Sequence, residues 1–141
     1  KRQLDHKLKE LGEGNFETAS AQAEDLPFEN ISFDTVVSTL VLCTVNNPKQ
    51  SLKEIFRVLK PGGKLLFLEH VHAHDNPNRA KWQGRIEPVW KHLAGGCHLT
   101  RDTLKSIQET GLTIEDVTHS SLRKAPSFIR PSIRGIATKS L

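Results

Sequence analysis

The pattern of apolar and polar residues changes along the chain, and it predicts the central strands and helix. Residues 35–45 form a nearly continuous run of β-branched and aliphatic side chains, which is typical of a strand buried on both faces of a parallel sheet. The next apolar residues recur at the spacing of one helix face: Leu52, Ile55, Phe56 and Leu59. The Pro-Gly-Gly sequence at 61–63 is expected to end this helix, and a second buried strand is expected to start over 65–68. Two such strands joined through a helix form a right-handed βαβ unit.

Two elements are expected before this unit, a short helix over residues 1–11 and a short strand over residues 15–22. After it, Asn76 and Pro77 are typical of a helix N-cap and a first helical residue. The apolar residues that follow again have helical spacing: Trp82, Ile86, Trp90 and Leu93.

A further helix is expected to be capped by Thr100 and to end at Gly111. The last strands, over 112–118 and 133–139, are joined by a basic loop, which indicates an antiparallel hairpin at one edge. Alternating strands and helices in the first part favour an α/β fold with a mainly parallel sheet.

Composition narrows the class of protein. The chain has 141 residues, which is long enough for one globular domain. Its net charge is +4 and its isoelectric point is near 9.2. Charges of both signs are interspersed, as on a solvated surface, and no apolar run approaches the roughly 20 residues of a membrane helix. Cys43 and Cys97 form neither a CxxC motif nor a disulfide framework, and Cys43 is expected to pack in the core.

Three segments resemble the successive motifs of one enzyme family, in order and in spacing. They read AEDLPF at 23–28, FDTVVSTLVL at 33–42 and RVLKPGGKLLFLEHV at 57–71. They resemble the class I S-adenosylmethionine (SAM)-dependent methyltransferases of the small-molecule type (type 11, UbiE-like). More narrowly, two later segments resemble the methyltransferase-like thiol S-methyltransferases: PVWKHLAGGCHLTRDTL at 88–104 and IRPSIRGIATKS at 129–140.

The resemblance implies a Rossmann-like sheet with strand order 3-2-1-4-5-7-6 and an antiparallel last strand. Residues 14–22 would then be strand 3, and residues 1–141 a single partial methyltransferase domain, with 72–99 as an inserted helical segment on the substrate side. Strands 1 and 2 and the Gly-rich SAM loop have no counterpart, because Gly12-Glu13-Gly14 follows a helix and not a strand. The sequence also contains no methionine. We therefore expect a C-terminal fragment or a truncated form of a methyltransferase.

The resemblance also implies where SAM would bind. Gln22 and Ala23 fall on positions that contact the adenine, with Glu24 or Asp25 as acceptor for its amino group. Beside the methionine part of SAM the resemblance places Ser38, Thr39 and Leu40.

Candidates for the acceptor side follow the second strand of the βαβ unit, at the edge where such sheets bind ligands. Glu69 and His70 could act as base or position the substrate, or they could be a polar strand end with ordinary hydrogen bonds. Trp82 and Trp90 could roof an apolar substrate pocket or simply pack. Cys97, on the substrate side, could be a reactive thiol or an inert one.

The sequence HxHxHD at 70–75 places imidazoles on one strand face, where a metal site is conceivable, but methyl transfer from SAM needs no metal and we expect none. The expected function is SAM-dependent methyl transfer to a small, apolar acceptor such as a thiol. The alternative is a non-catalytic methyltransferase remnant that acts as an interaction protein. We expect a cytoplasmic protein that binds no nucleic acid, and the resemblance implies peripheral association with the endoplasmic reticulum or lipid droplets through a segment upstream of Lys1.

Overall fold

The computed structural model describes residues 17–122 and 125–141, so the helix expected over residues 1–11 lies outside the described residues. The elements follow in the order β1 (Phe33–Thr39), α2 (Pro48–Val58), β2 (Leu59–His70), α3 (Pro77–Leu93), α4 (Thr103–Glu109), β3 (Leu112–Ser121), the 3-10 helix η1 (Ser127–Ile129) and β4 (Pro131–Lys139).

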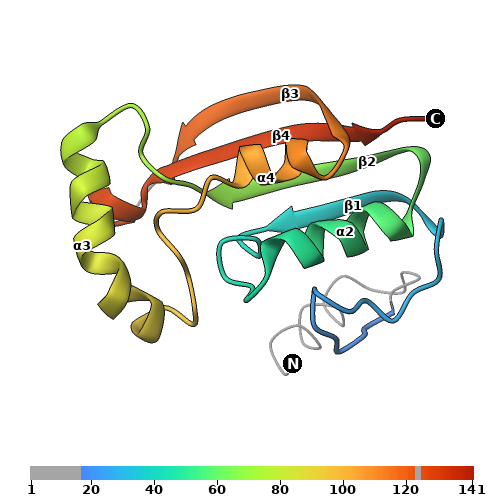
Figure 1. Ribbon diagram of the computed structural model, residues 1–141, viewed down its shortest axis with the longest axis horizontal. Helices are drawn as coiled ribbons and strands as arrows, with labels where there is room; N and C mark the ends of the chain where they lie inside the picture. The colour runs from blue at the N-terminus through green and yellow to red at the C-terminus, as the bar shows by residue number, and fades with distance from the viewer. Residues whose placement is uncertain (1–16, 123–124) are drawn as a thin grey trace, which may run out of the picture.

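The sheet has four strands in the order β1-β2-β4-β3 (Figure 1). β1 and β2 are parallel, and β4 runs antiparallel to both β2 and β3. The expected βαβ unit and the expected terminal hairpin are both confirmed, and the order is that of strands 4-5-7-6 in the class I methyltransferase sheet. Within the described residues, β1 pairs with β2 alone, which leaves its other edge unpaired.

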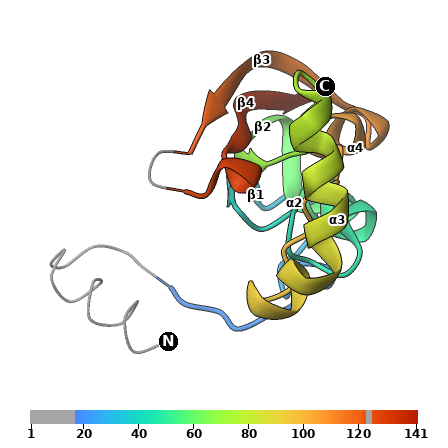
Figure 2. The same cartoon turned by 90° about the vertical axis from the view of Figure 1, so that its left-hand side faces the viewer.

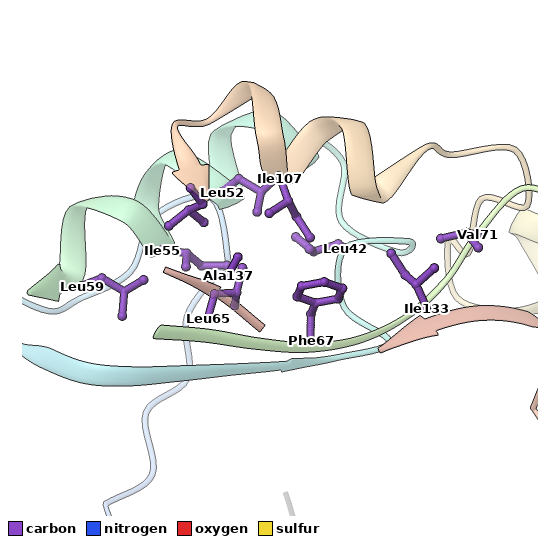
Figure 3. Close-up of a cluster of buried hydrophobic side chains, with 11 residues drawn as sticks. Leu42, Leu52, Ile55, Leu59, Leu65, Phe67, Val71, Ile107, Ile133 and Ala137 are labelled. Carbon is purple, nitrogen blue, oxygen red and sulfur yellow. The ribbon is translucent and has the colours of Figure 1, made fainter. Parts of the chain in front are cut away.

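The core lies between the sheet and two helices that cover one of its faces (Figure 3). Leu52 and Ile55 of α2 and Ile107 of α4 pack against Leu65 and Phe67 of β2, and all five side chains are buried. The apolar stripe of α2 therefore becomes the buried face that its spacing predicts. Burial of such side chains contributes about 1.5–3 kcal/mol each and fixes the carboxyl ends of β1 and β2.

Helix α3 stands across the end of the sheet to which β1 and β2 point (Figures 1 and 2). Its one buried residue is Gln83, whose Oε1 accepts a hydrogen bond from the Ala73 amide at 2.8 Å. The Gln83 Nε2 donates to the Phe128 carbonyl at 2.9 Å. The helix is thus anchored by a polar side chain, while Trp82 of its apolar stripe is 58% exposed. In the described part of the chain, no helix is long and apolar enough to cross a bilayer.

Two boundaries of the central unit differ from expectation. The first strand ends at Thr39 and not near residue 45, because Leu40 takes the left-handed conformation, with φ at +54°, and the chain turns. The helix ends at Val58, and β2 begins at once with Leu59, so the Pro-Gly-Gly sequence lies inside the strand.

Two other expectations are wrong in the described residues. Residues 17–22 contain no strand, and only an isolated bridge links Gln22 to Asp25, because no strand lies beside this segment to pair with it. The cap of α4 is Asp102 and not Thr100: the Asp102 carboxylate accepts a hydrogen bond from the Lys105 amide at 3.1 Å.

Candidate functional site

A cavity of about 210 Å³ opens at the carboxyl ends of β1 and β2, where parallel sheets place their ligand sites. Most of its wall is apolar and comes from Leu40, Ala94, Leu122 and Ile129. The polar or polarisable groups that face it are His70, Trp90, Thr44 and the thiols of Cys43 and Cys97. The cavity therefore joins the end of the sheet, α3 and the β3–β4 loop.

The turn after β1 forms the floor of this cavity and is held in an uncommon conformation. Leu40 has positive φ, and its amide donates to the Leu68 carbonyl at 2.8 Å. The Arg101 guanidinium donates to the Leu42 carbonyl at 2.7 Å. A positive φ at a branched residue costs about 1–3 kcal/mol and persists where surrounding contacts impose it, which is frequent at binding sites.

Glu69 also holds this turn, and it is not among the residues that line the cavity. Its side chain is fully buried, and the carboxylate accepts hydrogen bonds from Ser38 Oγ at 2.7 Å, the Val41 amide at 3.1 Å and the Cys43 amide at 3.4 Å. Burial raises the pKa of Glu69, against the three donors, which favour the ionised form. The structure thus places this predicted catalytic residue in the core, where it fixes the turn.

His70 points the other way, into the cavity. It is only 2% exposed, and neither ring nitrogen has a hydrogen-bond partner among the described residues. The Nε1 of Trp90 is likewise buried without a partner, and its ring packs edge-to-face on Phe128 at 5.3 Å. Because buried polar groups almost always find a partner, these nitrogens indicate a cavity that a polar ligand atom completes.

Cys43 and Cys97 meet at the same cavity, although they are far apart in the sequence. The His98 amide donates to the Cys43 carbonyl at 2.8 Å, which lays the two segments side by side. The Cys43 thiol, followed by the nearby His70 and Trp90 rings, lowers the pKa of the Cys97 thiol. The Cys97 thiol and burial together raise the pKa of Cys43.

The residues implied for the adenine end of SAM lie in the loop before β1. Glu24 is already engaged, because its Oε1 accepts from the Asn47 amide at 3.1 Å, which lowers its pKa. Asp25 is exposed, so its carboxylate is open to a donor. Arg57, paired with Glu54 at 2.7 Å, also binds carbonyls of this loop and holds it against α2.

The other implied SAM positions differ in their exposure to solvent. Gln22 is exposed and Ala23 half-buried, next to Asp25. Ser38 turns its hydroxyl to Glu69 in the core, whereas Thr39 is exposed at the end of β1. These assignments remain predictions.

The structure therefore brings together His70, Trp90, Cys97 and Leu40, but neither Glu69 nor Trp82 joins them. Sequence patterns missed Leu122 and Ile129, because they come from the irregular connection between β3 and β4. They also missed Gln83, because no pattern distinguishes a buried glutamine from a solvated one.

A second cavity of about 320 Å³ lies beside the histidine-rich segment after β2. His72, His74 and Arg79 line it together with the end of β3. The rings of His72 and His74 are 4.8 Å apart, but no group of three potential metal ligands forms within residues 17–122 and 125–141. We assign no function to this cavity.

The family model and the curated proteins that this chain resembles are all methyltransferases. Residues 2–67 match a family model described as a methyltransferase domain. Human thiol S-methyltransferase TMT1A is 39% identical over 108 residues, which are 77% of this chain and 44% of that protein. Rat thiol S-methyltransferase TMT1B is 53% identical over 78 residues, which are 55% of this chain and 32% of that protein. The chain thus spans less than half the length of these curated relatives.

Solved structures support the same fold. A methyltransferase-family protein from Bacillus halodurans superposes with a TM-score of 0.75 at 19% identity, over 96% of this chain and 77% of that one. At this identity the likeness concerns the fold alone.

Proposed function

The chain is a member of the class I methyltransferases by sequence and by fold, and we propose that it serves SAM-dependent transfer of a methyl group to a small, apolar thiol. The observation that carries the proposal is the buried imidazole of His70, whose two nitrogens have no hydrogen-bond partner among residues 17–122 and 125–141. It lies at the wall of a mainly apolar cavity at the carboxyl end of the sheet. The named activity of the relatives TMT1A and TMT1B supports the choice of a thiol.

The residues present fit one side of SAM. The exposed Asp25 carboxylate can accept from the exocyclic amine of adenine. Thr39 ends β1, and Leu40 follows it, where the methionine part would lie. When bound, SAM supplies a methyl group already activated on a sulfonium. The protein then has to align the acceptor, exclude water and remove a proton.

His70 is placed to take that proton. A free thiol has a pKa near 8.5, so a base beside it raises the fraction of nucleophilic thiolate. An imidazole nitrogen that no described residue pairs with can accept the thiol proton directly, and Leu40 and Ile129 give the cavity apolar walls. In this proposal Glu69 positions the turn and does not touch the acceptor.

The cavity also limits the size of the acceptor. A dry cavity of about 150 Å³ can hold benzene, so about 210 Å³ is room for a thiol with a single ring or a short alkyl chain. The unpaired Trp90 Nε1 can donate to the acceptor sulfur or to one polar substituent.

The test is a hybrid protein in which this chain replaces the segment of human TMT1A that it matches. Transfer of labelled methyl from SAM to benzenethiol and to phenol would be compared. We expect transfer to the thiol, and a loss of about 10²–10⁴-fold in kcat for His70→Ala, the usual contribution of a general base.

The two tryptophans of α3 provide a test variant and a matched control. Trp90→Ala should raise KM for the thiol at least about tenfold, because Trp90 lines the cavity, whereas Trp82→Ala should leave KM unchanged. A hybrid that binds SAM but methylates phenol as fast as benzenethiol, or in which the two tryptophan variants behave alike, contradicts the proposal.

A further inference from the structure

Two thiols line the cavity, and methyl transfer uses neither of them. Cys97 is half-buried, whereas Cys43 is only 2% exposed. The hydrogen bond from the His98 amide to the Cys43 carbonyl holds their segments together, and both residues line the same cavity. Both are free.

We propose that this pair is a second reactive site, at which the Cys97 thiolate opens small, apolar disulfides and the Cys43 thiol then closes an internal disulfide with it. An accessible nucleophile in front of a buried partner is the arrangement that two-step thiol–disulfide exchange requires. The cavity supplies the binding part of the site, since its walls are mainly apolar.

The surroundings of Cys97 favour the attack. A thiolate is the reactive form of cysteine, and it is favoured by donors and by nearby positive charge. The pKa of Cys97 is lowered by the adjacent Cys43 thiol and by the rings of His70 and Trp90. His70 is buried and lines the same cavity as Cys97, so it can also take the proton that Cys97 gives up.

The reaction balances without a further reagent. Cys97 Sγ forms a bond to one sulfur of the disulfide RSSR, the S–S bond breaks, and the first RS⁻ leaves. Cys43 Sγ then attacks Cys97 Sγ, its proton passes to the departing group, and the second thiol leaves. The protein dithiol is oxidised to a disulfide and RSSR is reduced to two RSH.

The products are thiols released into the cavity where the proposed methyl acceptor binds. The exchange itself requires no SAM, so it can be tested apart from the proposed methyl transfer, and either proposal can fail alone. Each chain performs one exchange and then needs an external thiol to reduce it.

The test uses the 141-residue chain and 4,4′-dithiodipyridine, a small aromatic disulfide that releases a coloured thione. We expect rapid release of two thione molecules per chain, and a product that has lost two hydrogens and carries no pyridylthio group. At pH 5 only about one in 3,000 ordinary thiols with a pKa of 8.5 is ionised, whereas the pKa of Cys97 is lowered. A thiolate of lower pKa is also a weaker nucleophile, so the chain should react at least about tenfold faster than glutathione at that pH.

Two variants separate the roles of the thiols. Cys97→Ser should lose the rapid phase, whereas Cys43→Ala should release one thione molecule and retain one pyridylthio group on Cys97. Circular dichroism would establish that each variant is folded, and the mass of the oxidised wild-type chain tests the proposal even if a variant is not. A wild-type product with two pyridylthio groups, or a Cys97→Ser variant that reacts as fast as wild type, would overturn it.

Discussion

Replacement of Glu69 by alanine is expected to destabilise the protein strongly, although the residue does not face the cavity. Its carboxylate accepts hydrogen bonds from Ser38 Oγ and from the amides of Val41 and Cys43. Alanine would leave the Ser38 and Cys43 donors buried and unpaired, at about 1–3 kcal/mol each, and would lose a further bond of about 1 kcal/mol at Val41. The expected loss is about 3–7 kcal/mol, a large share of the 5–15 kcal/mol typical of a domain.

Glu69→Gln is the matched control. Glutamine keeps one oxygen acceptor and the shape of the side chain, so the expected loss is about 1 kcal/mol at pH 4. Burial raises the pKa of Glu69 above its ordinary value of 4.5, so the folded state binds its proton more tightly than the unfolded state. The Glu69 contribution to stability must therefore fall as pH rises above 4.5, and the deficit of the Gln variant should shrink between pH 4 and pH 7.

Urea unfolding followed by tryptophan fluorescence and far-ultraviolet circular dichroism would measure these differences. An alanine variant within 1 kcal/mol of wild type would refute the assigned structural role. So would a Gln deficit that grows from pH 4 to pH 7.

Two further predictions concern other parts of the fold. Gly135→Ala should lower the free energy of unfolding in urea by about 2–4 kcal/mol, because a Cβ there would collide with the Asp116 carbonyl. Gly84→Ala is the control and should be neutral or slightly stabilising, because no atom lies within 4 Å of the added Cβ. Equal effects of the two substitutions would contradict this packing. The Arg57 hydrogen bond lowers the pKa of Glu54. The free energy of unfolding of wild type should therefore exceed that of Glu54→Gln by about 1 kcal/mol at pH 7, and the difference should disappear as pH falls below 4.5. A difference that persists at pH 3 would argue against the ion pair.

The sequence predicts the elements whose burial is periodic. The stripe of α2, the βαβ unit and the terminal hairpin all follow from local patterns, because each buries one continuous face. The end of β1 could not be predicted this way. The apolar run continues unchanged into the turn, and what ends the strand is the side chain of Glu69, 26–31 residues away from its partners.

The sequence was enough to select residues of the candidate site, but it could not predict that they lie together. His70, Trp90 and Cys97 stand out as chemical types, and the family resemblance indicates the edge of the sheet. Their convergence depends on how α3 docks, and that docking rests on the buried amide of Gln83, which carries no periodic signal. The same docking explains why Trp82, on the apolar stripe, stays in solvent.

The most direct test of the central claim is acceptor binding observed at Trp90 itself. The chain has two tryptophans, so Trp82→Phe makes Trp90 the only reporter. Titration with benzenethiol should give a saturable change in Trp90 emission, and His70→Ala in the same background should raise the half-saturating concentration at least about tenfold. A change that is linear in thiol concentration, or saturation that is unaffected by the loss of His70, would contradict the claim that this cavity holds the methyl acceptor.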